Sequence, residues 1–500
     1  MKIKSQQKET CTEYDKNGEV SILGKENSNV ISDSSFWKEY PDRDVEFVRW
    51  YPCNVGALTG QEIFEKDEEE KDTEISFYVH IPFCNNVCIC CPYNKFSTRS
   101  KILIDYLEAL KTEICNYAKQ DYVKNAKFVS GYFGGGTPTT LSPEQLEDLL
   151  SCLYTELNID ENASITMETT PIDITEEKIE VLKKYNVNRI SVGVQSLDDV
   201  LLKRIGRNYN AQKALDCIKM LKDNGIKHVC ADLMWGLPGQ TKEQWEETLK
   251  YMISLGLVDS YSLYQYTVLP SSPLYLRMER GQIPKCPDEE AQQEMYWDSV
   301  RIFHEAGFLS VSDIDFVSPS VLKDDKVEYF TIPETNGKGL ICKTCDIAKH
   351  VAHTWYEGKP MLSIGSGSYG YLNHSMYLNE PNVKEYIRKV NVEEYAVVMG
   401  KYVTKEERMR RSMVLGIKLL RFYRDDFKQM HGADMMDVFK DRIDKLVEWG
   451  LVALTDEYIE VTYPKGWYYM ENVSKMFYSE ENYRLPQPNA TGTILLKLLK

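Results

Sequence analysis

Three cysteines in the first fifth of the chain, Cys84, Cys88 and Cys91, have the spacing C-x3-C-x2-C. They follow a run of β-branched and aromatic residues at 75–81, which predicts a strand that ends at Pro82. Three thiolates on one loop suit three irons of a [4Fe-4S] cubane and leave the fourth iron without a protein ligand. A zinc ribbon would need a second, similarly spaced Cys pair, and a disulfide would need an oxidising compartment. The spacing therefore predicts a cluster that does chemistry on a bound molecule as well as carrying electrons.

The bulk composition is that of a soluble globular protein, with 43% apolar and 27% charged residues. A length of 500 residues predicts two or three domains. The net charge of −16 argues against a nucleic-acid partner, because phosphate binding needs a basic face. Thirteen cysteines without a hydrophobic signal segment indicate a reduced, cytoplasmic setting. No apolar run approaches 18 residues, so we expect no membrane span.

From residue 74 onward, strand patterns alternate with helix patterns, two of which begin at capping boxes, Ser142 with Gln145 and Thr241 with Gln244. This alternation predicts an α/β fold of parallel strands with right-handed crossovers. Six units fall short of a closed eight-fold barrel, so we expect a partial (β/α)6 TIM-like barrel with an open side and with its chemistry at the carboxyl ends of the strands. The expected strands are 75–81, 127–133, 164–169, 189–194, 227–234 and 260–266.

Polar residues and glycines stand where these strands end. Three consecutive glycines, residues 134–136, end the second strand and would let the backbone pass close to a ligand, although a tight turn without a ligand explains them too. Glu168 ends the third strand, where a lone carboxylate is costly unless it is paired. Gln195 ends the fourth strand and Asp232 the fifth. For Arg207 or Asp232 taken alone, a surface salt bridge is the simpler interpretation.

The lead-in Tyr-Val-His-Ile-Pro-Phe-Cys at 78–84 and the cysteine spacing resemble the radical S-adenosylmethionine (SAM) superfamily. Within it they resemble the HemN-like branch, which contains oxygen-independent coproporphyrinogen III dehydrogenase, HemW heme carriers, and HemN-like methyltransferases and cyclopropanases. The resemblance spans about residues 75–480. It departs from the family at Cys90, which stands where an aromatic residue usually precedes the third cysteine. A small hydrophobe in that position is the favoured interpretation, and a spare ligand is the alternative.

The resemblance implies a SAM site at the carboxyl ends of the strands. The glycine loop would meet the SAM amino group through its backbone, and Glu168 would pair with that group. Arg207 would hold the SAM carboxylate as a bidentate pair, with Gln195 beside it, and Asp232 would accept from the ribose hydroxyls. The implied set of cofactor-binding residues is Tyr78, Gly135, Gly136, Thr137, Glu168, Gln195, Arg207, Asp232 and Thr267.

The resemblance also implies that a low-potential donor such as flavodoxin or ferredoxin supplies an electron. SAM then yields a 5′-deoxyadenosyl radical, which abstracts hydrogen. One reaction is transfer, in which a second SAM provides a carbon that methylates or cyclopropanates a tetrapyrrole or another sp2-carbon substrate, so one or two SAM molecules are expected. Heme-opening members of the branch are a variant of transfer. A second is oxidative decarboxylation of a porphyrinogen propionate. A third is no catalysis at all, only heme carriage as in HemW.

Composition favours transfer. Residues 261–390 contain 17 acidic residues against 13 Lys and Arg, which is not a propionate-binding composition. Heme carriers are associated with a His-Asn…Tyr-Trp segment, which here reads His353-Thr-Trp355-Tyr356.

The expected domains are a disordered tail at 1–34, an N-terminal arm and linker at 35–73, the radical SAM barrel at 74–270, a substrate-side extension at 271–400, a winged-helix-like domain at 401–485 and a tail at 486–500. The arm is rich in aromatic residues, so we expect it to pack over the catalytic domain.

A second cluster of metal-ligand residues lies at Cys342, Cys345, His350 and His353. Two thiolates and two imidazoles are a legitimate tetrahedral set for zinc, although the pairs are closer together than in a zinc finger. The alternatives are buried thiols with histidines that line the substrate opening, or a histidine that handles a substrate proton.

Overall fold

The computed structural model describes residues 40–65, 74–91, 93, 95–268, 272–322, 327–344 and 349–483, and the backbone of two short paired strands, β1 (Thr12–Tyr14) and β2 (Val20–Ile22). Apart from these strands, the tails expected at 1–34 and 486–500 lie outside the described residues, as does nearly all of the acidic linker. None of the helices in the described ranges combines the length and apolarity needed to cross a bilayer.

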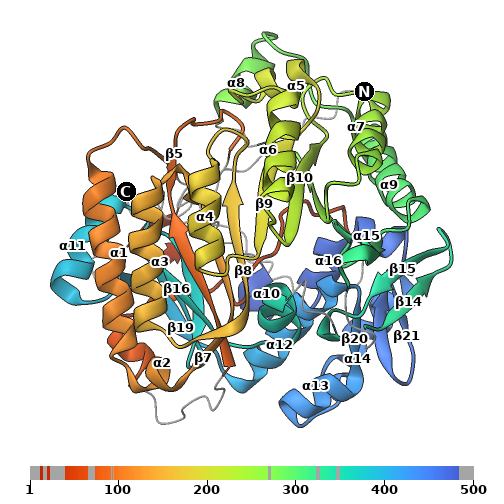
Figure 1. Ribbon diagram of the computed structural model, residues 1–500. Helices are drawn as coiled ribbons and strands as arrows, with labels where there is room; N and C mark the ends of the chain where they lie inside the picture. Colours follow the sequence, from red (N-terminus) through yellow and green to blue (C-terminus); the bar gives the residue numbers. More distant parts are fainter. Residues whose placement is uncertain are drawn as a thin grey trace.

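Six parallel strands form the centre of the sheet, as the alternating pattern predicts (Figure 1). Their order in space follows the order in the chain, so each crossover joins neighbouring strands. They are β4 (Glu74–Ile81), β7 (Lys127–Gly135), β8 (Ile159–Thr169), β9 (Arg189–Gln195), β10 (His228–Trp235) and β11 (Ser260–Gln265).

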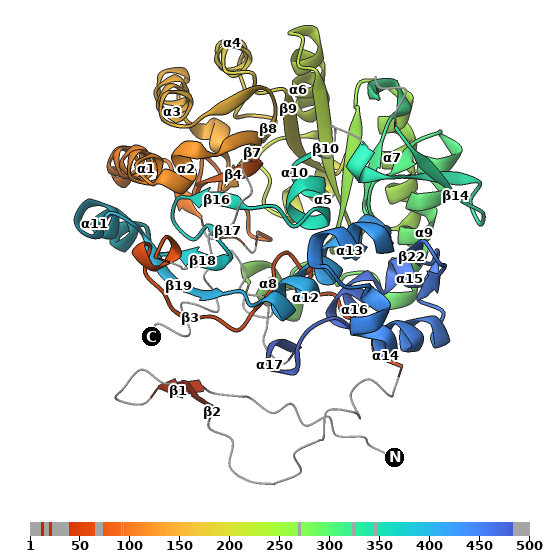
Figure 2. The same ribbon diagram turned by 90° about the horizontal axis from the view of Figure 1, so that it is seen from below.

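Helices cover the outer side of this sheet, and in Figure 2 they form an arc around the strands. The capping boxes at the starts of α3 and α7 are present: in each pair, Ser142 with Gln145 and Thr241 with Gln244, the side-chain oxygen of one residue accepts from the backbone N–H of the other. The crossover helices are α1 (Ile102–Ala118), α2 (Asp121–Asn125), α3 (Pro143–Glu156), α4 (Glu176–Lys184), α5 (Asp199–Arg204), α6 (Ala211–Asp223) and α7 (Lys242–Ser254).

The sheet continues past the six strands on both sides and does not close. Its fifteen strands end at β14 on one edge and β3 on the other, so the barrel is partial, as expected. Beyond β4 lie β16 (Met361–Ile364), which is parallel to it, then β17 (Tyr369–Leu372), β18 (Ser375–Asn379), β19 (Val397–Tyr402) and β3 (Gly56–Ala57). Beyond β11 lie β13 (Asp315–Val317), β12 (Leu309–Ser310), β15 (Gly337–Leu340) and β14 (Tyr329–Ile332).

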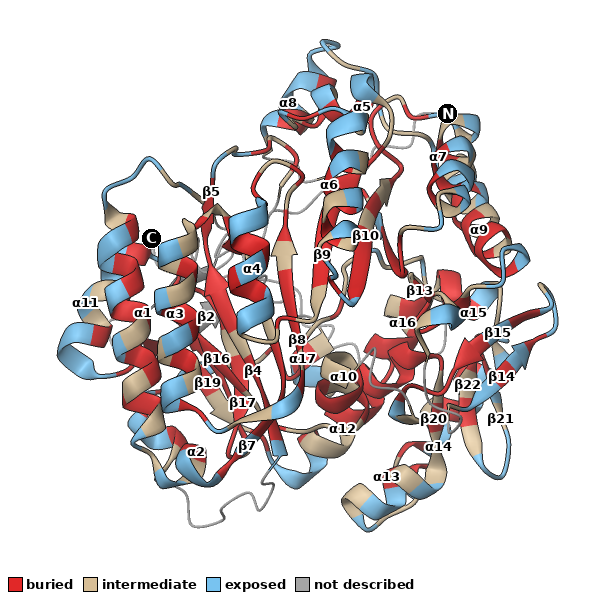
Figure 3. Cartoon of the chain, in the orientation of Figure 1, coloured by how far each residue is buried: buried red, intermediate tan, exposed pale blue. Residues whose placement is uncertain are grey.

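The inside of the curved sheet is polar. Along β9, Ile190 and Val192 are fully buried under the helices, whereas Arg189 and Ser191 alternate onto the opposite face. Figure 3 shows these strands as the most buried part of the fold. A closed eight-fold barrel fills its interior with bulky branched side chains. Here polar side chains line the inside, which we call the lumen, so it is equipped to hold a ligand.

The C-terminal region forms a separate small unit of helices around a three-stranded sheet, in which a hairpin turns at Asp456–Glu457. Its elements are α12 (Lys405–Gly416), β20 (Arg421–Tyr423), α13 (Arg424–His431), α14 (Met435–Glu448), β21 (Val452–Leu454), β22 (Tyr458–Val461), α15 (Lys465–Tyr468), α16 (Met470–Lys475) and α17 (Glu480–Tyr483). The domain bounds given above remain predictions.

The segment between the barrel and this unit contains more regular structure than the sequence predicts. The sequence patterns predict no strand in residues 309–340, yet they add four strands to the sheet, in which short runs such as Tyr329–Ile332 alternate between exposed and buried. The helices here are α8 (Pro273–Glu279), α9 (Glu289–Glu305), α10 (Lys349–Val351), the π-helix η6 (Ala352–Tyr356) and α11 (Val383–Glu393). Short 3-10 turns are η1 (Gln61–Ile63), η2 (Pro138–Thr140), η3 (Pro319–Val321), η4 (Cys342–Thr344) and η7 (Ile417–Leu419).

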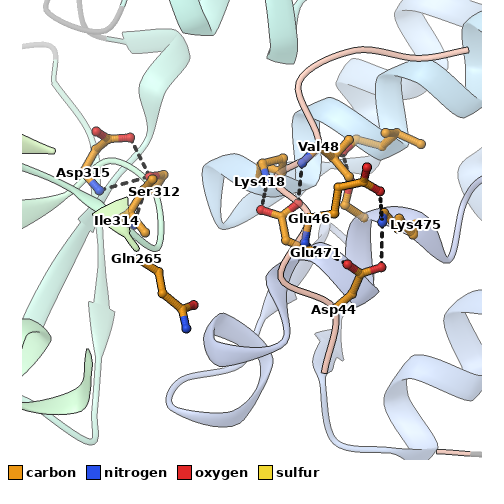
Figure 4. Close-up of polar contacts among 12 residues, drawn as sticks. Asp44, Glu46, Val48, Gln265, Ser312, Ile314, Asp315, Lys418, Glu471 and Lys475 are labelled. Carbon is orange, nitrogen blue, oxygen red and sulfur yellow. Dashed lines mark hydrogen bonds and ion pairs between the residues drawn. The ribbon is translucent and has the colours of Figure 1, made fainter. Parts of the chain in front are cut away.

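The N-terminal arm is fastened mainly to the C-terminal unit (Figure 4). The Lys475 ammonium bridges Asp44 and Glu46 at 2.6 and 2.8 Å. Glu471 accepts from the Val48 N–H at 2.8 Å and pairs with Lys418 at 2.5 Å. The arm also reaches the barrel, where the Arg43 guanidinium donates to Gln265 at the end of β11 at 2.7 Å. The arm therefore joins the two parts of the molecule.

We expect Glu471→Ala to lower the free energy of unfolding by about 3 kcal/mol, because it leaves a buried ammonium without its partner. The Lys418 side chain is 1% exposed and Glu471 11%. Urea unfolding would measure the loss. Glu448→Ala is the matched control, since its pair with Lys445 is exposed and its loss should cost at most about 0.5 kcal/mol. Equal destabilisation by both variants would contradict the role given to Glu471.

Candidate functional site

The Cys loop, residues 84–91, leaves the sheet where β4 and β7 end side by side. The Gly136 N–H donates to the Ile81 carbonyl and the Thr137 N–H to the Phe83 carbonyl, each at 2.8 Å. A Cβ on Gly136 would lie 2.6 Å from the Phe83 oxygen, so only glycine permits this approach. The Thr137 hydroxyl lies 3.7 Å from the Cys84 sulfur. The glycine loop thus fixes the first cysteine, and its contact with SAM stays a prediction.

The other cysteines of the loop lie in an apolar cluster between the loop and the neighbouring helices. Cys88 and Cys90 are 7% and 6% exposed and pack with Leu201 of α5 and Leu274 of α8. Burial raises the pKa of Cys90 to about 12, which keeps it a neutral thiol. These surroundings support the interpretation of Cys90 as a small hydrophobe in the position of an aromatic residue.

The three predicted ligands fit a cubane. Within the described ranges no three His, Cys, Asp or Glu side chains converge on a single ion. A cubane does not require this, because each thiolate binds a different iron. Burial raises the pKa of Cys84 to about 11, and the nearby Cys91 and Cys88 add to the rise. Bound iron would lower the pKa of these thiols because it stabilises the thiolate form. The three sulfurs are therefore suited to binding the iron of a cluster.

Glu168 stands inside the lumen next to the glycine loop. Its carboxylate accepts from the Tyr132 hydroxyl at 2.9 Å and from the Gly135 N–H. Burial raises its pKa, so a cationic group beside it would stabilise the carboxylate form. The ring of Tyr78 stacks on Tyr132, with centroids 6.1 Å apart. A Cβ on Gly134 would lie 3.1 Å from both the Glu168 oxygen and the Tyr78 hydroxyl, so the structure brings these predicted residues together.

Gln195 and Arg207 lie close together at the carboxyl end of β9. Gln195 ends β9 with a φ of 68°, in the left-handed region. A Cβ on Gly193 would lie 2.9 Å from the Gln195 amide and 4.0 Å from the Arg207 guanidinium. The Nε of Arg207 is buried and has no hydrogen-bond partner among the described residues. A carboxylate would satisfy that donor, which fits the predicted role.

Asp232 and Thr267 differ in their surroundings. Ser191 donates to the Asp232 carboxylate at 2.9 Å, and burial, reinforced by Glu168, raises the pKa of Asp232 to about 7. Asp232 therefore belongs to the lumen. Thr267 lies beyond the end of β11 and is exposed, and no hydrogen bond in the described part of the chain joins it to the other predicted residues.

The predicted zinc ligands have other partners. The Cys342 thiol is directed at the Val311 carbonyl at 3.5 Å, His350 Nδ1 lies 3.1 Å from the Ser130 hydroxyl, and His353 Nδ1 lies 2.8 Å from that of Ser76. These three do not form a metal-ligand group in the described ranges, and Cys345 lies outside them. The zinc site stays a prediction.

Sequence reasoning missed a hydrogen-bonded chain that joins the two histidines. Ser76 on β4 and Ser130 on β7 lie 2.7 Å apart, and each contacts one of the histidines. His350 also lies against the Tyr132 ring, with centroids 5.6 Å apart. These hydrogen bonds, together with the contact between His350 and Tyr132, thus connect the two serines with the network around Glu168. The alternation of small polar residues on these strands was the available signal.

Arg189, at the start of β9, was missed as well. Burial acts to lower its pKa, but Cys230, Tyr132 and Asp232 raise it on balance. No hydrogen bond or ion pair to its guanidinium occurs among the described residues. Its position on the lumen face of β9 could have been read from the two-residue alternation of the strand.

Comparisons with known proteins support the family that the cysteine spacing resembles. The Radical SAM superfamily model matches residues 78–252, and the HemN C-terminal domain model matches residues 403–469. The chain is 28% identical over 390 residues to the heme chaperone HemW of Bacillus subtilis, covering 78% of this chain and 95% of the relative. It is 26% identical to the oxygen-independent coproporphyrinogen III oxidase of Bradyrhizobium diazoefficiens, covering 77% and 83%. Neither relative is named a methyltransferase.

The fold matches that of the coproporphyrinogen III oxidase HemN from Escherichia coli, with a TM-score of 0.71 and 21% identity. The match covers 89% of this chain and 98% of the other. At this identity the likeness concerns the fold. It confirms the expected architecture of a partial barrel followed by a C-terminal unit.

We expect Cys84→Ala, Cys88→Ala and Cys91→Ala each to lose the iron–sulfur absorbance and the bound iron after anaerobic reconstitution, because each removes one thiolate ligand. Cys90→Ala should keep both, since that thiol lies in an apolar cluster. Iron analysis and visible absorbance measure the outcome. Loss of the cluster in Cys90→Ala together with its retention in Cys91→Ala would contradict the ligand assignment.

Arg207→Lys should weaken SAM binding by about tenfold or more, because a point charge cannot replace a planar fork on a carboxylate. Isothermal titration with SAM measures the change. The control is Arg204→Lys, whose guanidinium donates to the backbone carbonyls of Pro238 and Gly239. Unchanged SAM affinity in Arg207→Lys would show that this side chain does not hold the carboxylate.

Proposed function

Because the chain belongs to the radical SAM superfamily, in its HemN-like branch, we propose that it is a catalytic enzyme that removes hydrogen from a carboxylate-bearing tetrapyrrole held in the lumen. The [4Fe-4S] cluster and SAM, when bound, supply the 5′-deoxyadenosyl radical that does this chemistry. The protein contributes binding, orientation and shielding.

The chain's own residues divide these tasks. Cys84, Cys88 and Cys91 hold the cluster at the carboxyl ends of the strands. Arg207 receives the SAM carboxylate on its unpaired Nε, and Glu168 receives the amino group. Arg207 and Glu168 would fix both ends of the methionine part of SAM, and the tyrosines around Glu168 would limit the access of water to the lumen.

The position of Arg189 is the observation that supports the proposal most directly. It lies on the lumen face of β9, one strand from Glu168 on β8 and one from Asp232 on β10. The guanidinium is partly buried, and Asp232 and Asp315 stabilise its charge from a distance, but no described carboxylate forms an ion pair with it, so its donors can take up a substrate anion. Its planar fork matches a carboxylate in two parallel hydrogen bonds. A substrate carboxylate placed on Arg189 would therefore hold the neighbouring carbon atoms below the SAM site.

The oxidative reaction gains support from this position. The charge count that favoured transfer covers residues 261–390 only. It therefore leaves out two cations, Arg189 in the lumen and Arg49 in the arm. A relative named coproporphyrinogen III oxidase points the same way. Transfer remains the second candidate because Asp232, whose pKa is raised to about 7 mainly by burial, could accept the proton that an sp2 carbon loses on methylation.

Anaerobic turnover with SAM, a chemical reductant and a propionate-bearing porphyrinogen tests the proposal. We expect substrate-dependent 5′-deoxyadenosine together with carbon dioxide when a one-electron acceptor is added, because the substrate radical must lose one further electron as its carboxylate leaves. In Arg189→Gln the substrate-dependent rate should fall on the order of 10- to 100-fold, because a charge-assisted bidentate contact is lost, while SAM affinity is unchanged.

The other outcomes separate the alternatives. Formation of S-adenosylhomocysteine alongside 5′-deoxyadenosine would show that the reaction is transfer and would contradict oxidation. Tight substrate binding without SAM cleavage would indicate a carrier and contradict catalysis. Arg189→Lys is the matched variant, and it should retain part of the activity because the charge remains while the fork is lost. Wild-type kinetics in Arg189→Gln would remove this residue from the substrate site.

A further inference from the structure

Three segments lie together at one end of the molecule: a first that contains most of the Cys loop, described at residues 85–91, 93 and 95–101, a second at residues 199–213, and a third at residues 273–286. An apolar cluster holds them together, with Cys88 from the first, Leu201 from the second and Leu274 from the third. The side chain of Asn86 also donates to the Gly206 carbonyl at 2.8 Å. In Figure 1, β5 (Phe83–Cys84), α5 and α8 lie at this same end. We call the surface of these three segments the loop face.

The loop face has a charge opposite to that of the whole protein. Its three segments contain ten Lys and Arg residues against two acidic residues, whereas the whole chain has a net charge of −16. The first segment contains three cations and no acid. A positive region that surrounds one loop of an acidic protein attracts a negatively charged partner to that loop and repels a positive one.

The cations of the loop face are not used in ion pairs. Seven of them are exposed and form no ion pair with any described residue: Arg99, Lys101, Lys203, Lys213, Arg277, Arg280 and Lys285. Elsewhere on the surface, Lys219, Lys250 and Lys440 pair with a carboxylate four residues away on their own helix. The positive charge of the loop face is therefore available to an incoming molecule.

Apolar side chains are exposed among these cations, one on each segment. Val87 is 45% exposed, Val200 57% and Leu276 44%. Apolar groups within a charged surface are the arrangement of a protein–protein interface, where the apolar atoms are buried and the charges orient the partner. Nucleic acid would use the cations but has no use for these three side chains.

We propose that the loop face is the docking surface for an acidic, low-potential one-electron carrier protein. The proposal rests on the function proposed above, which requires one electron for each SAM that is cleaved. The carrier loses one electron and the cluster on Cys84, Cys88 and Cys91 gains it, with no bond made or broken between the proteins. Cys91 is partly exposed beside the loop face, so the path for the electron is short.

The test compares two variants with equal changes in net charge. Lys203→Glu/Arg277→Glu/Lys285→Glu reverses three charges on the loop face. Lys384→Glu/Lys428→Glu/Lys440→Glu reverses three exposed charges on α11, α13 and α14, away from it. The probe is an acidic flavodoxin, and its binding to the reconstituted protein is measured by isothermal titration at low and high salt.

We expect the loop-face variant to bind the carrier about tenfold or more weakly at low salt, and the control to stay within about twofold of the wild type. High salt should remove most of the difference. Dithionite should reduce the cluster equally fast in all three proteins, because it needs no docking surface. Equal affinities for the carrier, or tighter binding of a single-stranded oligonucleotide than of the carrier, would overturn the proposal.

The outcomes also distinguish this inference from the proposed function. Absence of SAM cleavage with dithionite would contradict the function, whereas charge-dependent binding of the carrier would still support the docking surface. Normal cleavage with dithionite, combined with equal carrier affinity in the two variants, would contradict only the docking surface.

Discussion

The close approach of two strand ends is the constraint on which the site depends. Gly136 at the end of β7 touches the backbone of Phe83, and a Cβ would leave only 2.6 Å to the Phe83 carbonyl. That contact aligns the Cys loop with the ends of the neighbouring strands, where Glu168, Gln195 and Asp232 stand. Because the parallel strands share one direction, their carboxyl ends meet at one edge, and one backbone contact places the predicted cluster ligands beside the residues predicted to hold SAM.

The open barrel has a second consequence, which concerns its interior. A closed barrel is stabilised by large apolar side chains inside, whereas this sheet ends at β14 and β3 and keeps polar side chains on its inner face. The apolar contribution to stability therefore comes from the outer layer of helices and from the arm. Polar groups inside must find partners within the lumen, as Ser76 and Ser130 do with the two histidines. No hydrogen bond or ion pair from the described residues reaches the Arg189 guanidinium, although Asp232 and Asp315 stabilise its charge at longer range.

Much of the barrel could be predicted because local signals agree with the fold: the strands, the two capping boxes and the residues at strand ends all follow from patterns in short windows. Arg189 could not be found this way, because its function depends on what faces it from β8 and β10. Residues 309–340 were misjudged because strands of two to four residues carry little periodicity. The partners of His350 and His353 are serines more than 200 residues away, which no local pattern reveals.

Electron entry and substrate binding impose opposite electrostatic demands, and the fold separates them. A docking surface works best when its charges are exposed and unpaired, as on the loop face, because long-range attraction speeds association. A substrate site works best when its charge is shielded from water, as Arg189 is, because the attraction is then less screened. The Cys loop lies between these two environments, with Cys91 partly exposed and Cys84 buried. Under the two proposals, an electron would pass from the loop face to the cluster without opening the lumen to solvent.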